Sequence, residues 1–221
     1  SIYNICSYLS ENYYQGLVVL KSTVEPETSE KISKLYTLKI LHNPEFLSAS
    51  TAEEDFKNQN HIVLGKTSIL SDCDLTILVE FYEKLFPFAK ITVLNSTESE
   101  MMKIGINTFY AVKIQYFNEI YLICKKLGIS FDKVKNSMIN NGWINQMHTQ
   151  VPGTDGKLSY GGMCFPKDTN ALNQYLKKNN IPHGIINSTI NERNSMRDKS
   201  KYNTIEYIFI FMALYFLVLF L

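Results

Sequence analysis

Short apolar runs alternate with polar, helix-like stretches through the first 95 residues of the chain. The strand-like runs are residues 16–21, 38–41, 61–65 and 90–94, and the helical stretches between them include residues 28–36 and 75–86. Apolar runs of this length predict buried strands. Because no hairpin dipeptide separates them, the alternation predicts βαβ units and a parallel sheet.

The pattern becomes purely helical after residue 95. Thr97 and Glu100 form an S/T-x-x-E capping box, and helical spacing then continues to about residue 126 without a proline. Such a helix, about 45 Å long at 1.5 Å per residue, spans between domains or lies against a partner subunit, because one small domain can hardly bury it. Further helices are expected at residues 131–140, 168–178 and 184–194, with a long loop at 145–165. The sequence thus predicts an α/β protein: a partial Rossmann-like parallel sheet followed by an all-α central dimerisation domain with one long helix.

The last 15 residues, 207–221, form an unbroken apolar run behind a basic stretch. A membrane-spanning helix needs about 20 residues, so the run is short for a span. Three interpretations stay open: a membrane anchor or shortened span, a helix buried against a missing neighbour, or out-of-frame sequence. The expected domains are residues 1–95, the end of a dinucleotide-binding domain, residues 96–195, a helical substrate and dimerisation domain, and residues 196–221, a basic linker with an apolar tail.

The composition of the chain excludes several classes of function. Of 221 residues, 45% are hydrophobic, which is enough for a sizeable core and excludes a wholly disordered chain. The 22 Lys and Arg residues balance 21 Asp and Glu residues without forming a basic stripe, so no nucleic acid partner is expected. The start shows no signal peptide pattern, which favours a cytoplasmic protein, membrane-associated only if residues 207–221 insert. The four cysteines lack CxxC spacing and the four histidines lack metal-ligand spacing, so no metal site is expected and the histidines are placed at the surface or in loops.

One loop has the composition of a nucleophile site. It reads Tyr160-Gly161-Gly162-Met163-Cys164-Phe165-Pro166-Lys167-Asp168. The glycines let a ligand approach the backbone, and a cysteine directly before a helix start has its thiolate favoured by the helix dipole and by Lys167. Asp168 either caps the helix or accepts a proton near Cys164.

Two further groups of residues could act on a substrate. Glu100, Lys103 and Asn107 share one face of the long helix, where an ammonium and a carboxamide would suit a developing oxyanion; the alternative is a solvated helix face. Thr23 and Glu45 each follow a predicted strand. They are expected at the carboxyl edge of the sheet, where open α/β folds bind ligands, unless they are ordinary loop residues.

These residues together resemble a known family. The shared motifs are Lys21-Ser22-Thr23-Val24, Asn43-Pro44-Glu45-Phe46-Leu47, Glu100-x-x-Lys103-x-x-x-Asn107, Asn118-Glu119 and the block from Gly161 to Asp168. In this order they resemble the UDP-glucose/GDP-mannose dehydrogenase family over residues 1–193. The resemblance implies NAD as cofactor and a UDP-sugar as substrate, with UDP-glucose oxidised to UDP-glucuronate in two hydride transfers.

The resemblance also implies a role for each site residue. Cys164 would form the thiohemiacetal and thioester, Lys103 and Asn107 would stabilise oxyanions, and Asp168 would assist proton transfer. Glu45 and Thr23 would position or activate water. Gly161 and the backbone of Glu45, Phe46 and Leu47 would contact the sugar nucleotide, and Lys167 and Thr23 would lie near the nicotinamide. The long helix would form a homodimer through positions such as Phe109, Val112, Tyr116 and Ile120.

Two features of the family are not found in this sequence. No G-x-G-x-x-G dinucleotide fingerprint occurs in the 221 residues, and the family's third domain has no counterpart. A shortened dehydrogenase that is inactive by itself is therefore expected. Two alternatives remain: a non-catalytic dimerising remnant with a membrane-associating tail, and a UDP-N-acetylhexosamine or GDP-mannose dehydrogenase.

Overall fold

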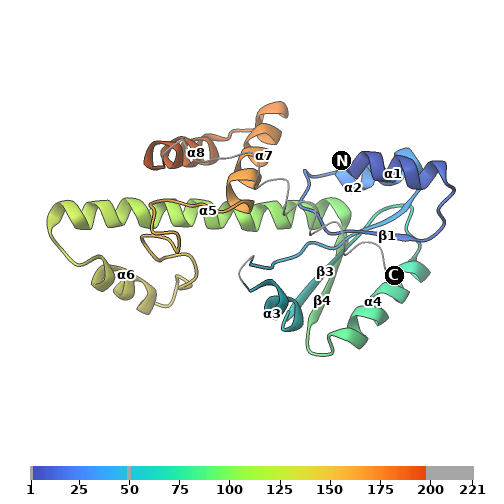
Figure 1. Ribbon diagram of the computed structural model, residues 1–221, viewed down its shortest axis with the longest axis horizontal. Helices are drawn as coiled ribbons and strands as arrows, with labels where there is room; N and C mark the ends of the chain where they lie inside the picture. Colours follow the sequence, from blue (N-terminus) through green and yellow to red (C-terminus); the bar gives the residue numbers. More distant parts are fainter. Residues whose placement is uncertain (1, 49–50, 198–221) are drawn as a thin grey trace. The chain divides into compact units, whose positions relative to one another are not determined.

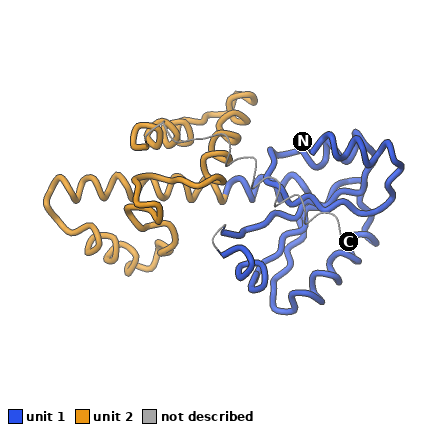
Figure 2. Tube along the Cα trace, viewed as in Figure 1, with its two compact units in different colours: residues 1–105 blue, residues 106–221 orange. Residues whose placement is uncertain are grey.

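The structure, a computed structural model, describes residues 2–48 and 51–197. Its contacts divide the chain into two compact units, residues 1–105 and residues 106–221 (Figure 2). Unit 1 contains a four-stranded sheet with helices, and unit 2 is helical (Figure 1). No helix within the described ranges is long and apolar enough to cross a membrane, and the predicted apolar tail, 207–221, lies outside them.

The sheet of unit 1 has the strand order β1-β2-β3-β4. The strands are β1 (Leu17–Leu20), β2 (Lys39–His42), β3 (His61–Lys66) and β4 (Lys90–Asn95), each within one residue of its predicted range. β1 and β2 are parallel, as are β3 and β4, but β2 runs antiparallel to β3 with His42 opposite Gly65. The sheet is therefore mixed, and the prediction of a wholly parallel sheet is wrong at its central pair.

The connection between β2 and β3 explains the reversal. Its one helix, α3 (Ala52–Lys57), was not predicted and has no buried residue. A parallel crossover needs a helix that packs on the sheet and carries the chain back along it. Six residues rise only about 9 Å. The chain therefore returns along the neighbouring strand in the opposite direction.

Helices cover both faces of the sheet, because alternate strand residues point to opposite sides. On one face, α4 (Asp72–Leu85) packs through Leu78 and Tyr82 against Leu41, Ile62 and Leu64. On the other face lie α1 (Ile2–Glu11) and α2 (Thr28–Tyr36), as Figure 1 shows. The second core cluster contains Cys6, Leu20, Ile32, Leu38 and Ile40.

The long helix α5 (Ser96–Leu127) begins one residue before the predicted Thr97. Its capping box is formed by Asn95 and Glu98: the Glu98 N–H donates to Asn95 Oδ1 at 2.8 Å, and the Asn95 N–H donates to Glu98 Oε2 at 2.9 Å. The predicted box of Thr97 and Glu100 is therefore wrong: it lies two residues too far along the chain. Asn95 caps α5 because it ends β4, and the extended backbone there is the conformation that a cap residue adopts.

Glu100 instead points into the interior of unit 1. It is fully buried, and its Oε1 accepts the N–H of Ser29 in the first turn of α2 at 2.7 Å. Burial raises the pKa of Glu100, while the backbone N–H groups at this helix start act against that rise. The carboxylate takes the place of a cap, since the Glu27 side chain does not cap α2. The start of α5 is thereby tied to α2.

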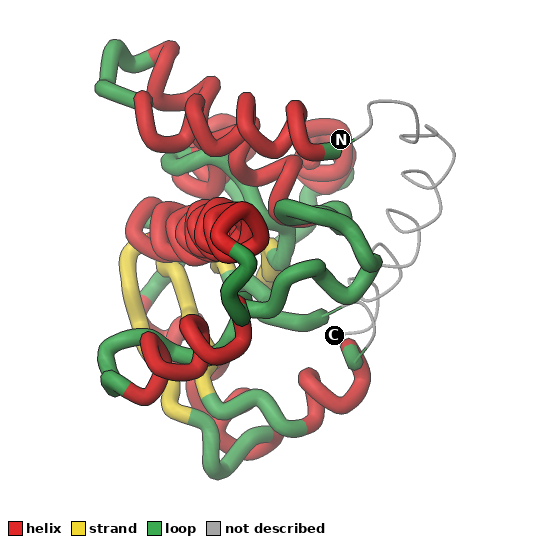
Figure 3. The backbone as a smooth tube through the Cα atoms, turned by 90° about the vertical axis from the view of Figure 1, so that its left-hand side faces the viewer, coloured by secondary structure: helices red, strands yellow, loops and turns green. Residues whose placement is uncertain are grey.

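Unit 2 is built on the rest of α5 and three further helices. They are α6 (Phe131–Asn140), predicted with the same bounds, α7 (Cys164–Lys178) and α8 (Gly184–Met196). α7 begins four residues before the predicted start, because Pro166 stands in its first turn, where the missing N–H has no helical partner to lose. The loop between α6 and α7 is drawn green in Figure 3 and contains the buried Tyr160, which is 1% exposed.

Candidate active site

Polar side chains gather at the carboxyl edge of the β1–β2 pair in unit 1. Because the two strands are parallel, the segments that follow them leave the sheet at the same edge. Lys21 Nζ donates to Asn43 Oδ1 at 2.7 Å, which joins the two segments directly. Thr23 and Glu45, both half-buried, lie two residues further along each segment. The fold thus brings the segments of both candidate residues to one edge.

Lys103 lies against the loop that contains Glu45. Its ammonium is 4.7 Å from the centroid of the Phe46 ring, a cation–π contact, and the side chain is 5% exposed. Within the loop, Glu45 Oε2 accepts the N–H of Leu47 at 2.7 Å. Glu100, Lys103 and Asn107 are all buried, so the alternative of a solvated helix face is wrong.

His42 is a residue that the sequence interpretation misplaced. It was expected at the surface or in a loop, but it ends β2, is fully buried, and its Nδ1 lies 2.8 Å from Ser99 Oγ on α5. Burial lowers the pKa of His42 to about 4, and the nearby ammonium groups of Lys21 and Lys103 act in the same direction. If the predicted strand at residues 38–41 had been extended by one position, it would have included His42 and predicted its burial in the sheet.

The absence of a side chain at Gly65 makes room for the contact between His42 and Ser99. A Cβ on Gly65 would lie 2.6 Å from Ser99 Cβ and 3.1 Å from the Ser96 Cα. Because Gly65 pairs with His42 across the sheet, the first turn of α5 reaches the imidazole only where this side chain is absent.

In unit 2, Asp168 and Asn107 form a buried pair. Asn107 Nδ2 donates to Asp168 Oδ2 at 2.6 Å, and Lys167 Nζ lies 2.8 Å from the other carboxylate oxygen. Asp168 is 1% exposed and lies inside α7, so the interpretation of this residue as a helix cap is wrong. Its burial follows from the early start of α7, which turns the fifth residue of that helix toward α5.

Cys164 is the first residue of α7 and is exposed. The positive end of the helix dipole favours a thiolate at this position, and Lys167 lies in the same turn. Gly162, two residues earlier, has φ of 70°, a conformation that glycine adopts at low cost. The site therefore combines an exposed thiol with a buried amide–carboxylate pair one turn further along α7.

Comparison with known proteins identifies the family. Residues 2–86 match the NAD binding domain of the UDP-glucose/GDP-mannose dehydrogenase family, and residues 97–195 match its central domain. The chain belongs to the UDP-glucose/GDP-mannose dehydrogenase family.

Individual relatives agree with this assignment. A UDP-glucose 6-dehydrogenase of Rickettsia felis is 32% identical over 197 residues, 86% of this chain and 42% of the relative. One of Bacillus subtilis is 30% identical over 190 residues, 82% of this chain and 39% of the relative. The structure of a UDP-glucose dehydrogenase from Pyrobaculum islandicum matches with a TM-score of 0.76 and 26% identity, covering 86% of this chain and 45% of that one. The chain thus spans about two fifths of the length of its curated relatives.

The family's cofactor is NAD, and the residues of this chain fit one end of it. The carboxyl edge of β1 and β2 offers the Thr23 hydroxyl and the Lys21 ammonium, suitable for the polar nicotinamide end. A pyrophosphate cradle needs a glycine-rich turn between a strand and a helix, and no such turn occurs in the described residues. Nor do residues 2–48 and 51–197 arrange three His, Cys, Asp or Glu side chains around a metal position.

Two arginines that the sequence interpretation did not single out anchor the loop before Cys164. Arg197 Nε donates to the Leu158 carbonyl at 2.8 Å, and Arg193 Nε donates to the Tyr160 carbonyl at 3.1 Å. The Arg197 guanidinium also fills the space beside Gly161, where a Cβ would lie 2.3 Å from Nη1. Only the folded loop shows these roles, because the arginines follow it by more than thirty residues.

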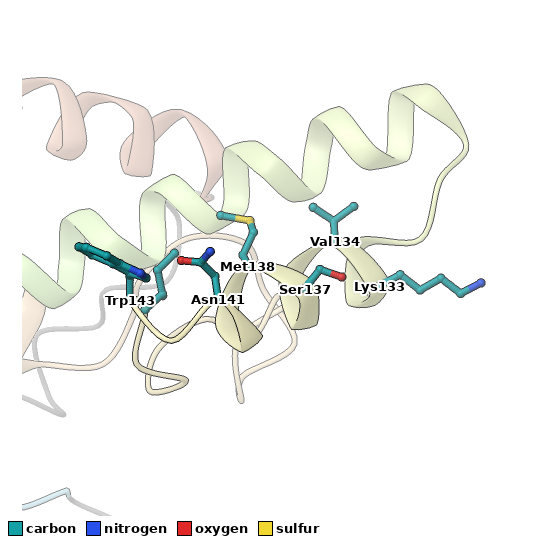
Figure 4. Close-up of a pocket in the computed structure, with 7 residues that line it drawn as sticks. Lys133, Val134, Ser137, Met138, Asn141 and Trp143 are labelled. Carbon is teal, nitrogen blue, oxygen red and sulfur yellow. The ribbon is translucent and has the colours of Figure 1, made fainter.

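A hollow of about 690 Å³ opens in unit 2 beside α6 (Figure 4). Val134, Met138 and Trp143 line it, and Trp143 is 91% exposed. None of the predicted site residues lines this hollow. The predicted site residues lie instead at the sheet edge of unit 1, on α5 and around the start of α7.

Proposed function

We propose that this chain provides the reacting residues of an NAD-dependent dehydrogenase that oxidises UDP-glucose to UDP-glucuronate. The observation that supports this most directly is the exposed Cys164 at the start of α7, one turn before the buried Asp168–Asn107 pair. The substrate rests on the two relatives described above, from Rickettsia felis and Bacillus subtilis, which are UDP-glucose 6-dehydrogenases 32% and 30% identical to this chain. A solved UDP-D-ManNAc dehydrogenase and a solved GDP-mannose dehydrogenase are 23% and 24% identical to this chain and support the fold alone.

In the proposed reaction, Cys164 acts as the nucleophile. Its sulfur bonds to the carbon of the sugar aldehyde, and the thiol proton passes to the aldehyde oxygen, which gives a thiohemiacetal. Bound NAD⁺ would supply the hydride acceptor for two oxidations, of the primary alcohol to the aldehyde and of the thiohemiacetal to the thioester, and each oxidation also releases one proton. The second oxidation leaves a thioester, and water then replaces the sulfur, releasing the carboxylate, a proton and the thiol.

The other residues stabilise negative charge, transfer protons and position water during these steps. Lys103 and Asn107 stabilise the oxyanions, because both offer N–H donors from buried positions. Asp168 assists proton transfer, with its carboxylate oriented by Asn107. Glu45 and Thr23 position the attacking water at the sheet edge. Substrate contacts come from Phe46, Leu47 and Gly161 as well, and Lys167 and Thr23 lie on the nicotinamide side.

Selective alkylation of Cys164 tests this proposal. Cys6 and Cys124 are buried, whereas Cys73 is exposed and, like Cys164, stands at a helix start. Cys73 is flanked in the sequence by Asp72 and Asp74, whereas Cys164 follows Gly162 and has Lys167 in the same turn. We expect iodoacetamide to label Cys164 first, as followed by mass spectrometry, and the aldehyde of UDP-glucose to protect it beyond the protection given by UDP-glucose.

Cys73 is the internal control, and its labelling is expected to be unchanged by either compound. Equal labelling of Cys73 and Cys164, or no extra protection by the aldehyde, would contradict the nucleophile assignment. Since no G-x-G-x-x-G occurs in the sequence, the 221-residue polypeptide by itself is expected to form no NADH.

We also propose the predicted domain division, 1–95, 96–195 and 196–221, and a dimer formed through α5. Phe109 and Tyr116 are 62% and 50% exposed, and their spacing of seven residues places both on one face of the helix. Val112 and Ile120 are half-buried on the same side. Two exposed aromatic side chains on one helix face favour burial against a second copy.

Replacing Phe109 with glutamate is expected to convert the dimer to a monomer. In a two-fold symmetric apolar contact, the substitution would place two like-charged carboxylates, one from each subunit, in the same interface. Light scattering at several concentrations measures the mass. Lys125→Glu, a charge change on the opposite side of α5, is the matched control and is expected to stay dimeric. A monomeric mass for the unaltered chain would rule this dimer out.

A further inference from the structure

Ser159, in the loop before Cys164, is bound through its N–H, its hydroxyl and its carbonyl. The N–H donates to Asn118 Oδ1 at 2.8 Å, the hydroxyl donates to Gln115 Oε1 at 2.5 Å, and the carbonyl accepts from Arg197 Nη2 at 3.1 Å. Ser159 is 2% exposed, and the side chains of Asn118 and Gln115 on α5 are buried as well. The loop is therefore fixed to α5 at one buried residue.

The backbone of Ser159 has a conformation that its side chain disfavours. Its φ of 59° lies in the left-handed region, where a Cβ comes close to a carbonyl oxygen. Residues keep such a conformation only where the surrounding contacts determine it. The hydrogen bonds to Asn118 and Gln115 are these contacts, and their loss would let the backbone turn to negative φ and redirect the chain toward Cys164.

The orientation of the Asn118 amide is determined by a second partner. Its Nδ2 donates to the carbonyl of Ile114, in the previous turn of α5, at 2.7 Å. Its Oδ1 therefore faces the Ser159 N–H. A flipped amide would set N–H groups against the Ser159 N–H and oxygen against a carbonyl. The acceptor for Ser159 is thus held in place by α5 itself.

The segment that contains Cys164 is attached to α5 on both sides. After Cys164, the carboxylate of Asp168 accepts from Asn107; before it, the N–H of Ser159 donates to Asn118. Asn107 and Asn118 are about three helical turns apart and lie on one face of α5. The start of α7 has no side-chain cap, so its first turn depends on the loop that leads into it.

We propose that Asn118, supported by Gln115, is a positioning residue that fixes the Ser159 peptide and thereby the first turn of α7, where Cys164 reacts. This inference rests on the proposed role of Cys164 as the nucleophile. A thiol held at a helix start has its thiolate stabilised by the helix dipole, and a nucleophile fixed by supporting residues is ready before the substrate binds. The motif Asn118-Glu119, which takes no part in the proposed reaction, gains a role in this way.

The pH dependence of alkylation tests the proposal in the full chain. Iodoacetamide labelling, followed by mass spectrometry over a pH series, gives the rate and the titration midpoint of Cys164, with Cys73 in unit 1 as the internal reference. Asn118→Leu is expected to raise the Cys164 midpoint and to lower its rate at pH 7 by roughly two- to fivefold, the usual effect of a helix start on a charge. Adding Ser159→Gly is expected to restore most of the rate, because glycine adopts positive φ without the hydrogen bond.

Asn136→Leu, the same change at an exposed asparagine of α6, is the matched control and is expected to leave the Cys164 midpoint unchanged. Labelling of the buried Cys124 on α5 reports unfolding of unit 2. If Asn118→Leu exposes Cys124, Ser159→Ala gives the answer, because it leaves α5 unaltered, removes the hydroxyl donor and keeps the disfavoured φ. Ser159→Ala is then expected to raise the midpoint, and Ser159→Gly to leave it close to that of the unaltered chain.

An unchanged Cys164 midpoint in Asn118→Leu, or in Ser159→Ala where that variant decides, overturns the proposal. So does a midpoint that Ser159→Gly fails to restore, because the effect would then come from packing of α5 and not from the loop conformation. Failure of the proposed function is distinguishable: it appears as absence of aldehyde protection of Cys164 in the unaltered chain, which the variants do not affect.

Discussion

Replacing Tyr160 with alanine is expected to lower the free energy of unfolding of unit 2 by about 3–5 kcal/mol, the usual cost of deleting a large buried aromatic ring. Tyr160 is 1% exposed, one of the largest fully buried side chains of the described residues. Arg193 stacks on its ring at 5.4 Å and also donates to its carbonyl. The substitution therefore leaves a cavity and removes the ring on which Arg193 packs, while the backbone carbonyl that Arg193 anchors stays in place.

Urea denaturation followed by circular dichroism measures this loss, and hydrogen exchange of the α7 amides assigns the transition to unit 2. Tyr160→Phe is expected to stay close to the unaltered protein, since the hydroxyl is 3.4 Å from Thr169 Oγ1, a long contact. Trp143→Ala removes a larger ring that is 91% exposed, and its effect is expected within about 0.5 kcal/mol. A Trp143 effect equal to that of Tyr160 would contradict the burial argument.

Replacing His42 with glutamine is expected to remove a strong pH dependence of stability in unit 1. The pKa of His42 is about 4 in the folded chain, below the value of about 6.5 of an unfolded histidine. Between these pH values the unfolded chain binds a proton at His42 and the folded chain does not, so stability falls as pH falls. At about 1.4 kcal/mol per pH unit, the loss between pH 6.5 and 4 is roughly 3 kcal/mol.

The measurement is the unfolding free energy of both proteins at intervals from pH 7 to pH 4. The difference between them isolates His42, because other groups such as Glu100 contribute equally to both. Ser99→Ala is the control: it removes the hydrogen-bond partner but leaves the imidazole buried, so stability is expected to fall by about 1 kcal/mol at every pH. Parallel curves for His42→Gln and the unaltered chain would show that burial does not set this pKa.

The local sequence pattern was sufficient to predict those elements whose position depends on their own residues. The helix at residues 131–140 has the predicted bounds, because Ser130 caps it and its apolar spacing is regular. The four strands lie within one residue of their predicted ranges, since short apolar runs have few other ways to be buried. The block from Gly161 to Asp168 is equally local, and the comparisons confirm the family that it indicated.

Long-range packing decided the rest. Strand direction depends on how the connecting helix packs on the sheet, so the sequence of neither strand predicts that β2 and β3 are antiparallel. Asn95 rather than Thr97 caps α5 because β4 ends there, and Asp168 is buried because α7 starts four residues early. The sequence by itself determined the family, the residue types of the site and most element positions. Only the tertiary structure decided which polar groups are desolvated, because burial at His42, Lys103 and Asp168 depends on neighbours distant along the chain.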